Sequence, residues 1–158
     1  MKYSMRGNVD PFIVMDVMEN ARKAEEGGRK IIHMEVGQPS TAAPSDALER
    51  TSQIIKSNPL GYTVALGLPE LRKKISDLYG RWYNLDLDPS RVIVTSGSSG
   101  AFILSFTALF EEGARVGIGA PGYPSYRQIL KSLGISPVDI VTNVKNKFQP
   151  TAKDVVSQ

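Results

Sequence analysis

The alternation of short β-branched runs with helical segments after Arg91 constrains the fold more than any other feature of the sequence. Short apolar runs rich in β-branched residues predict strands, whereas the longer segments between them have the spacing of helices. Strands joined by helices of this length predict right-handed βαβ crossovers and a mostly parallel sheet covered on both faces. We therefore expect an α/β fold. The expected strands are 92–95, 115–120 and 137–141, and the expected helices are a buried one at 101–110 and a second at 126–133.

The rest of the chain predicts four further helices and one strand. Asp10 and Pro11 have the residue types of an N-cap and a first helical position, and Gly27 ends the amphipathic pattern that follows. A helix that starts at Leu68 and Pro69 carries apolar residues at helical spacing on one face, so we expect that face to be core. This face consists of Leu71, Ile75, Leu78 and Trp82. Of the other two helices, one is expected at about 45–56 and one begins near 151. The strand is expected at 31–36.

The composition excludes several classes of protein. The chain has 158 residues, of which 41% are hydrophobic and 22% charged, as is ordinary for a globular domain and not for a disordered one. Its net charge of +3 is spread along the sequence, without the dense Lys/Arg block of a nucleic-acid-binding surface. The lack of cysteines excludes disulfides and thiolate zinc sites, and the longest apolar run, 101–110, is too short to span a bilayer. We expect a cytoplasmic protein without nucleic-acid or membrane partners.

The loop after the expected strand 92–95 has the residue types of an anion site. In an open α/β sheet, ligands bind at the carboxyl ends of strands, and the first N–H groups of a helix attract anions. Gly97, Ser98, Ser99 and Gly100 stand between a predicted strand and a predicted helix, which suits a phosphate. The alternative is that Ser98 or Ser99 only caps the helix.

A second loop, at 121–124, follows the next predicted strand. Its two prolines stiffen the chain, so Tyr123 can present a flat ring on which a planar cofactor stacks; the alternative is a proline-rich surface turn. Gly37, just past the strand 31–36, is either a backbone donor beside a substrate anion or a turn glycine. His33 is the single histidine and has no second ligand nearby, so we interpret it as a strand residue and expect no metal site.

Four motifs occur in order along the chain. They are Tyr62-Thr63, Gly67-Leu68-Pro69-Glu70-Leu71-Arg72, Gly97-Ser98-Ser99-Gly100 and Pro121-Gly122-Tyr123-Pro124-Ser125-Tyr126. This ordered set resembles the front half of a fold-type I pyridoxal-phosphate-dependent aminotransferase of class I/II, aspartate aminotransferase-like, over about residues 30–150. The resemblance implies a three-layer α/β/α arrangement, with 41–158 as an incomplete cofactor-binding large domain and 1–40 as an N-terminal arm, helix and strand belonging to the small domain.

The resemblance also implies pyridoxal 5'-phosphate as cofactor and a homodimer in the full-length protein. Gly97, Ser98 and Ser99 would bind the cofactor's phosphate, and Tyr123 would stack on its pyridine ring. Tyr62 would reach the phosphate held by the neighbouring subunit. These five residues are the cofactor-binding residues that the resemblance implies.

For the substrate, the resemblance implies that Gly37 lies beside the carboxylate of an amino acid or 2-oxo acid. The sequence departs from the family pattern at Ser40 and Thr41, where an acidic residue and an aromatic residue are common. The resemblance therefore says less about the substrate pocket than about the cofactor.

The family takes its Schiff-base lysine, the aspartate at the pyridinium nitrogen and the carboxylate-binding arginine from sequence after position 158. The resemblance therefore predicts an N-terminal fragment of an enzyme that transfers an amino group between an amino acid and a 2-oxo acid, with no catalytic residue in this chain and no activity of the chain alone. Two alternatives stay open. One is the front half of another fold-type I enzyme, such as a carbon–sulfur lyase or a synthase, and the other is a non-catalytic metabolite-binding α/β domain.

Overall fold

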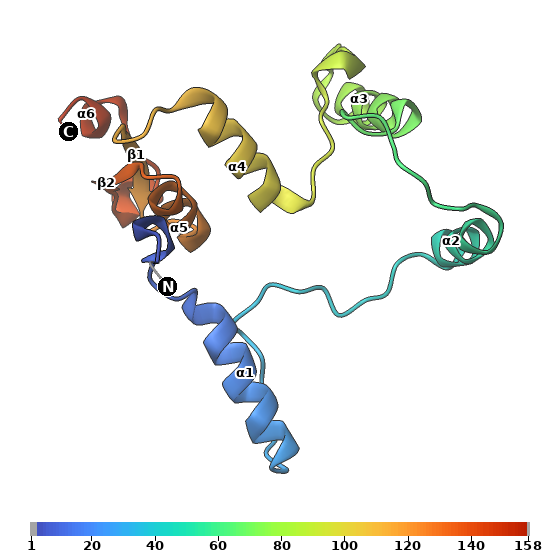
Figure 1. Cartoon of the computed structure of the whole chain (residues 1–158), viewed down its shortest axis with the longest axis horizontal. Coiled ribbons are helices and arrows are strands. Elements are labelled where there is room, and N and C mark those ends of the chain that lie inside the picture. The colour runs from blue at the N-terminus through green and yellow to red at the C-terminus, as the bar shows by residue number, and fades with distance from the viewer. Residues whose placement is uncertain (1–2, 158) are drawn as a thin grey trace. The chain divides into compact units, whose positions relative to one another are not determined.

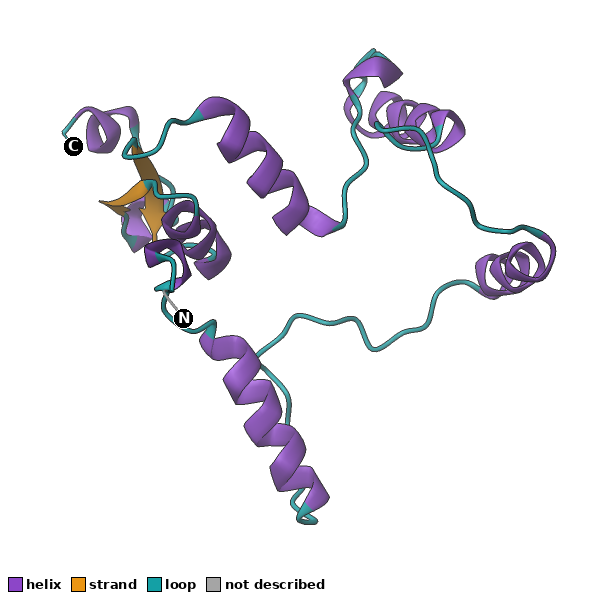
Figure 2. Cartoon of the chain, viewed as in Figure 1, coloured by secondary structure: helices purple, strands orange, loops and turns teal. Residues whose placement is uncertain are grey.

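The computed structural model describes residues 3–157 (Figure 1). Within that range most of the ordered elements are helices, and the strands occur only in the C-terminal part of the chain (Figure 2). The strands are β1 (Arg115–Ala120) and β2 (Ser136–Val141), and short 3-10 helices form at η1 (Met5–Gly7), η2 (Pro89–Arg91) and η3 (Val144–Asn146). The α-helices are α1 (Ile13–Glu26), α2 (Ser45–Ser57), α3 (Pro69–Tyr83), α4 (Gly97–Leu109), α5 (Pro124–Ser132) and α6 (Ala152–Val156).

The chain divides into two compact units. The first unit combines Met1–Glu35 with Ser96–Gln158, and the second unit is Val36–Thr95. The division expected at residue 40, between a small-domain part and a large-domain part, stays a prediction, because compactness does not say to which domain of a larger enzyme a segment belongs.

The first unit is built on a β1–α5–β2 crossover. The two strands pair in parallel and in register along their whole lengths. Gly134, at φ 75°, turns the chain from the end of α5 toward β2, in a backbone conformation that glycine adopts without strain. Leu130, Ile135 and Ile140 are buried and form the core between α5 and the sheet. The expected α/β class is confirmed, and the strand expected at 115–120 forms with those bounds.

The N-terminal segment is attached to this unit by η1, which packs on α5, and by two ion pairs. Arg6 donates to Glu112 at 2.9 Å, and Lys131 donates to Asp10 at 2.6 Å. The hydrogen bond from Lys131 lowers the pKa of Asp10 below its usual value. The expected N-cap role of Asp10 is therefore wrong: its carboxylate is engaged by α5, and α1 begins later, at Ile13.

Two expected strands do not form. Residues 31–36 and 92–95 run as irregular chain, and His33 is accordingly not a strand residue. A strand is defined by the backbone hydrogen bonds that it forms with a neighbouring strand. Within residues 3–157 only β1 and β2 pair in this way. The segment 92–95 has one cross-chain backbone bond instead, from the Val94 N–H to the Leu66 carbonyl at 3.0 Å.

Several helix starts follow the sequence, and the others differ by two to four residues; α5, expected at 126–133, spans Pro124–Ser132. α2 and α3 start at the expected Ser45 and Pro69, and α6 starts after Thr151, whose side chain forms a capping box with Asp154. The helix expected from 101 starts four residues earlier, at Gly97. The small residues interpreted as a loop are thus the first turn of α4. α6 ends at Val156.

Two faces expected to be core are at most half-buried. Trp82 of the α3 face has 67% of its surface exposed, and Leu109 of α4, the helix expected to be buried, has 72% exposed. α4 packs on α5 along one side, whereas its apolar residues lie on all sides, so most of its apolar surface stays uncovered in the described structure. None of the helices within residues 3–157 has both the length and the apolar character that crossing a membrane requires.

Candidate functional site

The N-terminus of α4 presents the predicted phosphate-binding residues. Gly97 has φ +72°, a left-handed conformation that turns the irregular segment before it into the helix. Ser98 and Ser99 follow in the first turn and are exposed. The N-cap position belongs to Ser96, so neither Ser98 nor Ser99 occupies it. The first turn of α4 contains no acidic residue, and the N–H groups at the start of a 13-residue helix attract an anion.

Tyr123 lies where β1 passes into α5. It occupies the N-cap of α5, with extended backbone, and Pro124 is the first residue of the helix. The preceding turn is tight, because a Cβ atom at Gly122 would lie closer than 3.0 Å to the carbonyl oxygen of Gly119. Tyr123 keeps 49% of its surface exposed, so it remains accessible at this turn.

A row of aromatic rings connects Tyr123 with α4. Tyr123 contacts Tyr126 edge to face, with ring centroids 5.4 Å apart, and Tyr126 contacts Phe102 in the same way at 4.7 Å. Such edge-to-face pairs are favourable beyond the area they bury. Phe102 lies one helical turn beyond Ser98 and Ser99. The packing of α5 on α4 therefore joins the two predicted cofactor-binding elements within one unit.

An open hollow of about 520 Å³ lies beside Tyr123, at the carboxyl end of β1. Phe148 lines it together with Gln149 and Pro150. The sequence analysis did not single out Phe148. The local signal is the turn at Asn143, whose side chain accepts from the Lys145 N–H at 3.0 Å and whose carbonyl accepts from the Phe148 N–H at 2.9 Å. This turn brings Phe148 back toward β1, which residue identity alone does not reveal.

The glycines of this hollow also bear on the alternative of a non-catalytic metabolite-binding domain. Gly117, Gly119 and Gly122 have the Gly-x-Gly-x-x-Gly spacing of a dinucleotide fingerprint. In that fingerprint the glycines form the turn between a strand and a helix. Here Gly117 and Gly119 lie within β1, and the anion-attracting helix start is that of α4, so the spacing does not form the fingerprint.

The remaining predicted site residues belong to the second unit. Tyr62 lies in an irregular segment and its side chain is fully exposed. Gly37 is exposed in a turn in which the Gln38 N–H donates to the Val36 carbonyl at 2.9 Å. The first unit thus contains Gly97, Ser98, Ser99 and Tyr123, with the Tyr126–Phe102 ring contact between α5 and α4, whereas Tyr62 and Gly37 belong to the second unit.

A cluster of three ionisable side chains lies near the end of the N-terminal segment of the first unit, shortly before Gly37. Nδ1 of His33 lies 2.7 Å from Glu35, and Nε2 lies 3.0 Å from Glu25 of α1. Hydrogen bonds to Glu35 and then Glu25 raise the pKa of His33 to about 8, and the bond with His33 lowers the pKa of Glu35. A protonated imidazole therefore ties the segment after α1 back to the helix.

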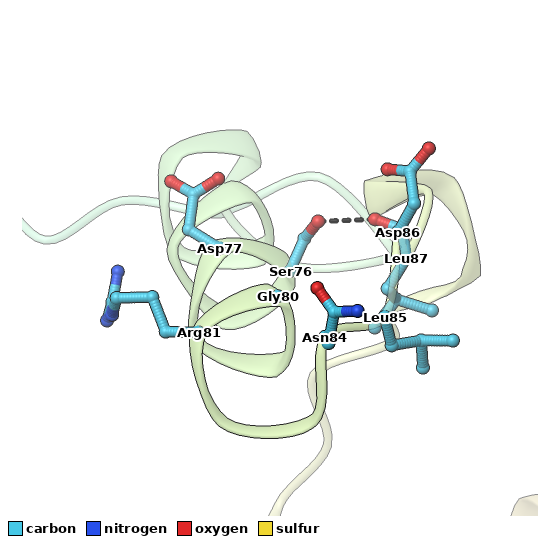
Figure 3. Close-up of a pocket in the computed structure, with 8 residues that line it drawn as sticks. All are labelled: Ser76, Asp77, Gly80, Arg81, Asn84, Leu85, Asp86 and Leu87. Atoms are coloured by element: carbon cyan, nitrogen blue, oxygen red, sulfur yellow. Dashed lines mark hydrogen bonds between the residues drawn. The ribbon is translucent and has the colours of Figure 1, made fainter.

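A second hollow, of about 570 Å³, lies in the other unit at the C-terminal end of α3 (Figure 3). Ser76 donates to the carbonyl of Leu87, which connects the helix to the chain that returns along it. Asp77 accepts from Lys73 at 3.0 Å, and this bond lowers the pKa of Asp77. None of the predicted site residues lines this hollow, which consists of Ser76, Asp77, Gly80, Arg81 and residues 84–87.

Comparison with known proteins gives consistent matches. A model of the class I and II aminotransferase family matches residues 29–158. Valine–pyruvate aminotransferase of Mycobacterium tuberculosis is 41% identical over 152 residues, covering 96% of this chain and 39% of that enzyme. A solved structure from Silicibacter pomeroyi, assigned as an aminotransferase, has 57% identity and a TM-score of 0.87, and an aminotransferase structure from Mycobacterium tuberculosis has 39% identity and a TM-score of 0.94. Both alignments cover 100% of this chain but only 40% and 41% of those chains, so the chain spans about two fifths of the length of the relatives it matches.

Proposed function

The chain belongs to the class I and II aminotransferase family, and we propose that the full-length protein transfers amino groups between an amino acid and a 2-oxo acid with pyridoxal 5'-phosphate as cofactor. The recognition made from four sequence motifs is confirmed by this membership. Members of the family generally depend on pyridoxal phosphate and act on amino acids and 2-oxo acids. The relatives reported above are aminotransferases, which favours amino-group transfer over the lyase, the synthase and the non-catalytic domain.

The observation that carries the proposal is the start of α4. A dianionic phosphate requires donors and positive potential, and the first turn of α4 provides backbone N–H groups, the hydroxyls of Ser98 and Ser99, and no acidic side chain. A Cβ at Gly97 would meet no described atom within 4 Å outside its two neighbours and the backbone of its own helix, so this side of the backbone has room for a ligand. This donor set fits the phosphate of the cofactor.

The exposed ring of Tyr123 fits the other end of the cofactor. Its edge-to-face contact with Tyr126 fixes the ring plane while one side stays accessible, which favours stacking of a planar heterocycle at low entropic cost. When bound, pyridoxal phosphate supplies the electron sink that stabilises negative charge at the α-carbon of the amino acid. Within this chain we assign only binding and orienting roles: Gly97, Ser98 and Ser99 hold the phosphate, and Tyr123 orients the ring.

The proposal includes three further points that rest on family membership. We propose that Tyr62 reaches the phosphate bound by the neighbouring subunit of a homodimer, since its side chain extends freely from the second unit. We propose that Gly37 donates its N–H to the substrate carboxylate, which its exposed turn permits. A cytoplasmic location, expected from the cysteine-free sequence, also belongs to the proposal.

The test is an amino-transfer assay of the full-length protein. The purified protein is incubated with pyridoxal phosphate, a panel of amino acids and either pyruvate or 2-oxoglutarate, and the new amino acid is measured. We expect transfer with at least one pair, and a Ser99→Ala variant that needs more cofactor for half-maximal rate. Release of ammonia or sulfide without a new amino acid would instead identify a lyase, and no turnover with a bound cofactor would refute the proposal.

A further inference from the structure

The chain that follows α1 turns back and runs along the helix (Figure 1). Gly28, at φ 83°, makes the reversal in a backbone conformation that glycine adopts without strain. The Arg29 N–H donates to a carbonyl of α1 at 3.0 Å, and no further backbone hydrogen bond among the described residues joins the segment 30–35 to the helix. Ile32 and Met34 are exposed, so the helix covers little of their apolar surface. Side-chain hydrogen bonds are therefore the main connection between this segment and α1.

His33 provides this connection through both of its ring nitrogens. Nδ1 lies 2.7 Å from a carboxylate oxygen of Glu35, and Nε2 lies 3.0 Å from a carboxylate oxygen of Glu25 in α1. An ionised carboxylate only accepts hydrogen bonds, so both nitrogens must carry a proton for both bonds to form. A neutral imidazole has one N–H and one bare nitrogen, and the bare nitrogen has no proton to donate. The two bonds therefore exist together only while the ring is protonated.

The two carboxylates differ in how well they tolerate the loss of this donor. The side chain of Glu35 is only 12% exposed, and its second oxygen accepts the Met34 N–H at 2.9 Å. The side chain of Glu25 is 44% exposed, so water can replace a donor that it loses. An acceptor that is left unpaired away from water is the costlier of the two. In the neutral ring the remaining proton therefore belongs on Nδ1, and the bond that is lost is the one to α1.

The charged groups that act on the ring are these two carboxylates, one from its own segment and one from α1. Hydrogen bonds to Glu35 and then to Glu25 raise the pKa of His33 to about 8. The next carboxylate of the helix, Glu26, is engaged by Arg22 instead. Because the bond to Glu25 requires the proton on Nε2, it is present below this pKa and is lost as the pH rises through it.

We propose that His33 is a proton-dependent latch between the segment 30–35 and α1. The protonated ring bridges Glu35 and Glu25 and holds the segment against the helix. When Nε2 gives its proton to the solvent, the bond to Glu25 opens and the bond to Glu35 stays. All three residues lie within the first unit. The latch uses none of the residues assigned to the cofactor or the substrate, so it goes beyond the proposed function and does not depend on it.

The first experiment determines which ring nitrogen carries the proton. NMR spectra of the histidine ring nitrogens are recorded on the full-length protein from about pH 6 to about pH 10, a range that includes both the ordinary and the raised pKa. The signals of His33 are those that are missing in a His33→Gln variant. We expect two protonated nitrogens at the acid end and a neutral ring protonated at Nδ1 at the alkaline end. A neutral ring protonated at Nε2 would overturn the latch.

The second experiment follows the segment itself by trypsin cleavage after Lys30, measured by mass spectrometry. Each rate is divided by the rate in Glu25→Ala at the same pH, so the pH dependence of trypsin cancels. From one pH unit below the pKa of His33 to one unit above it, the protonated fraction falls from about nine tenths to about one tenth. Over this range we expect the wild-type ratio to rise from below one toward one, because a released segment is cut more readily.

Two variants separate the latch from a general effect of charge. Glu25→Gln should keep the ratio below one at every pH, because an amide accepts from a protonated Nε2 and donates to a bare one. The matched control is Glu26→Gln, which removes the same charge from the adjacent position and should behave as the wild type. A wild-type pH step in Glu25→Gln, its loss in Glu26→Gln, or a wild-type ratio that does not change with pH would overturn the proposal.

Discussion

The tight turn before Tyr123 gives a prediction whose size follows from the structure. A methyl group at Gly122 would be closer than 3.0 Å to the Gly119 carbonyl oxygen, a separation that real Cβ atoms essentially never show. The position of the Cβ is fixed by the backbone and the atom it meets is a backbone oxygen, so no side-chain rotation relieves the contact. We expect Gly122→Ala to lower the free energy of unfolding by ~1–3 kcal/mol, as overpacked positions do. Because Tyr123 follows directly, we also expect weaker cofactor binding.

The assay is urea denaturation of the full-length protein, in which a change of midpoint at constant slope reports stability. Alanine substitutions at two other glycines of the same unit provide the comparison. At Gly117 the added Cβ would meet the Cδ1 of Ile140 at 2.9 Å, and the end of that flexible side chain can move, so we expect a smaller loss. At Gly7 no described atom lies within 4 Å, so Gly7→Ala should be neutral. A Gly122→Ala protein as stable as Gly7→Ala would refute the reasoning.

Three further predictions concern the site and the His33 cluster. Ser99→Ala should weaken cofactor binding by ~1.5–3 kcal/mol, the usual worth of a hydrogen bond to a charged group, as measured by cofactor titration; unchanged affinity would contradict the assignment. Tyr123→Ala should shift the cofactor absorbance and loosen binding, whereas Tyr123→Phe should do little, because the ring and not the hydroxyl stacks; equal effects would contradict stacking. The folded pKa of His33, about 8, lies above the ordinary histidine value of 6.5, so its ion pairs stabilise the fold fully below pH 6.5 and this stabilisation is lost as the pH rises through about 8. An NMR titration should show this pKa, and Glu35→Gln should lower it; a His33 pKa that stays at 8 in that variant would assign the shift to another cause.

Local patterns predicted the parts of the fold that local interactions determine. The run at 115–120 became β1 because its partner β2 lies close in sequence, and Pro69 and Thr151 marked helix starts because their effects act within one turn. The strands expected at 31–36 and 92–95 failed because a strand needs a neighbour, which no local pattern supplies. The face containing Trp82 had helical spacing, but spacing shows only that a face is apolar and not what covers it.

The candidate site, like the fold, was predictable from the sequence only in part. The residue types at Gly97, Ser98 and Ser99 indicated an anion site, although the helix began at Gly97 itself, because a first turn tolerates small residues that the interior of a helix does not. The ring contact from Tyr126 to Phe102, which joins Tyr123 to α4, depends on how α5 packs and could not be inferred from one-dimensional spacing. Phe148 was missed for the same reason.

The β1–α5–β2 crossover has a consequence for how the chain resists local opening. Among the described residues, the buried positions are Leu130, Ile135, Ile140 and Thr142, and Thr142 donates both its N–H and its hydroxyl to the Ala120 carbonyl at the end of the sheet. Amide protons of β2 should therefore exchange with solvent most slowly, while those of 31–44 and 58–66 exchange first. Because its parts are close in sequence, the crossover closes only a short loop when it forms, so it should be the first piece of the chain to become native and the last to be digested by a protease.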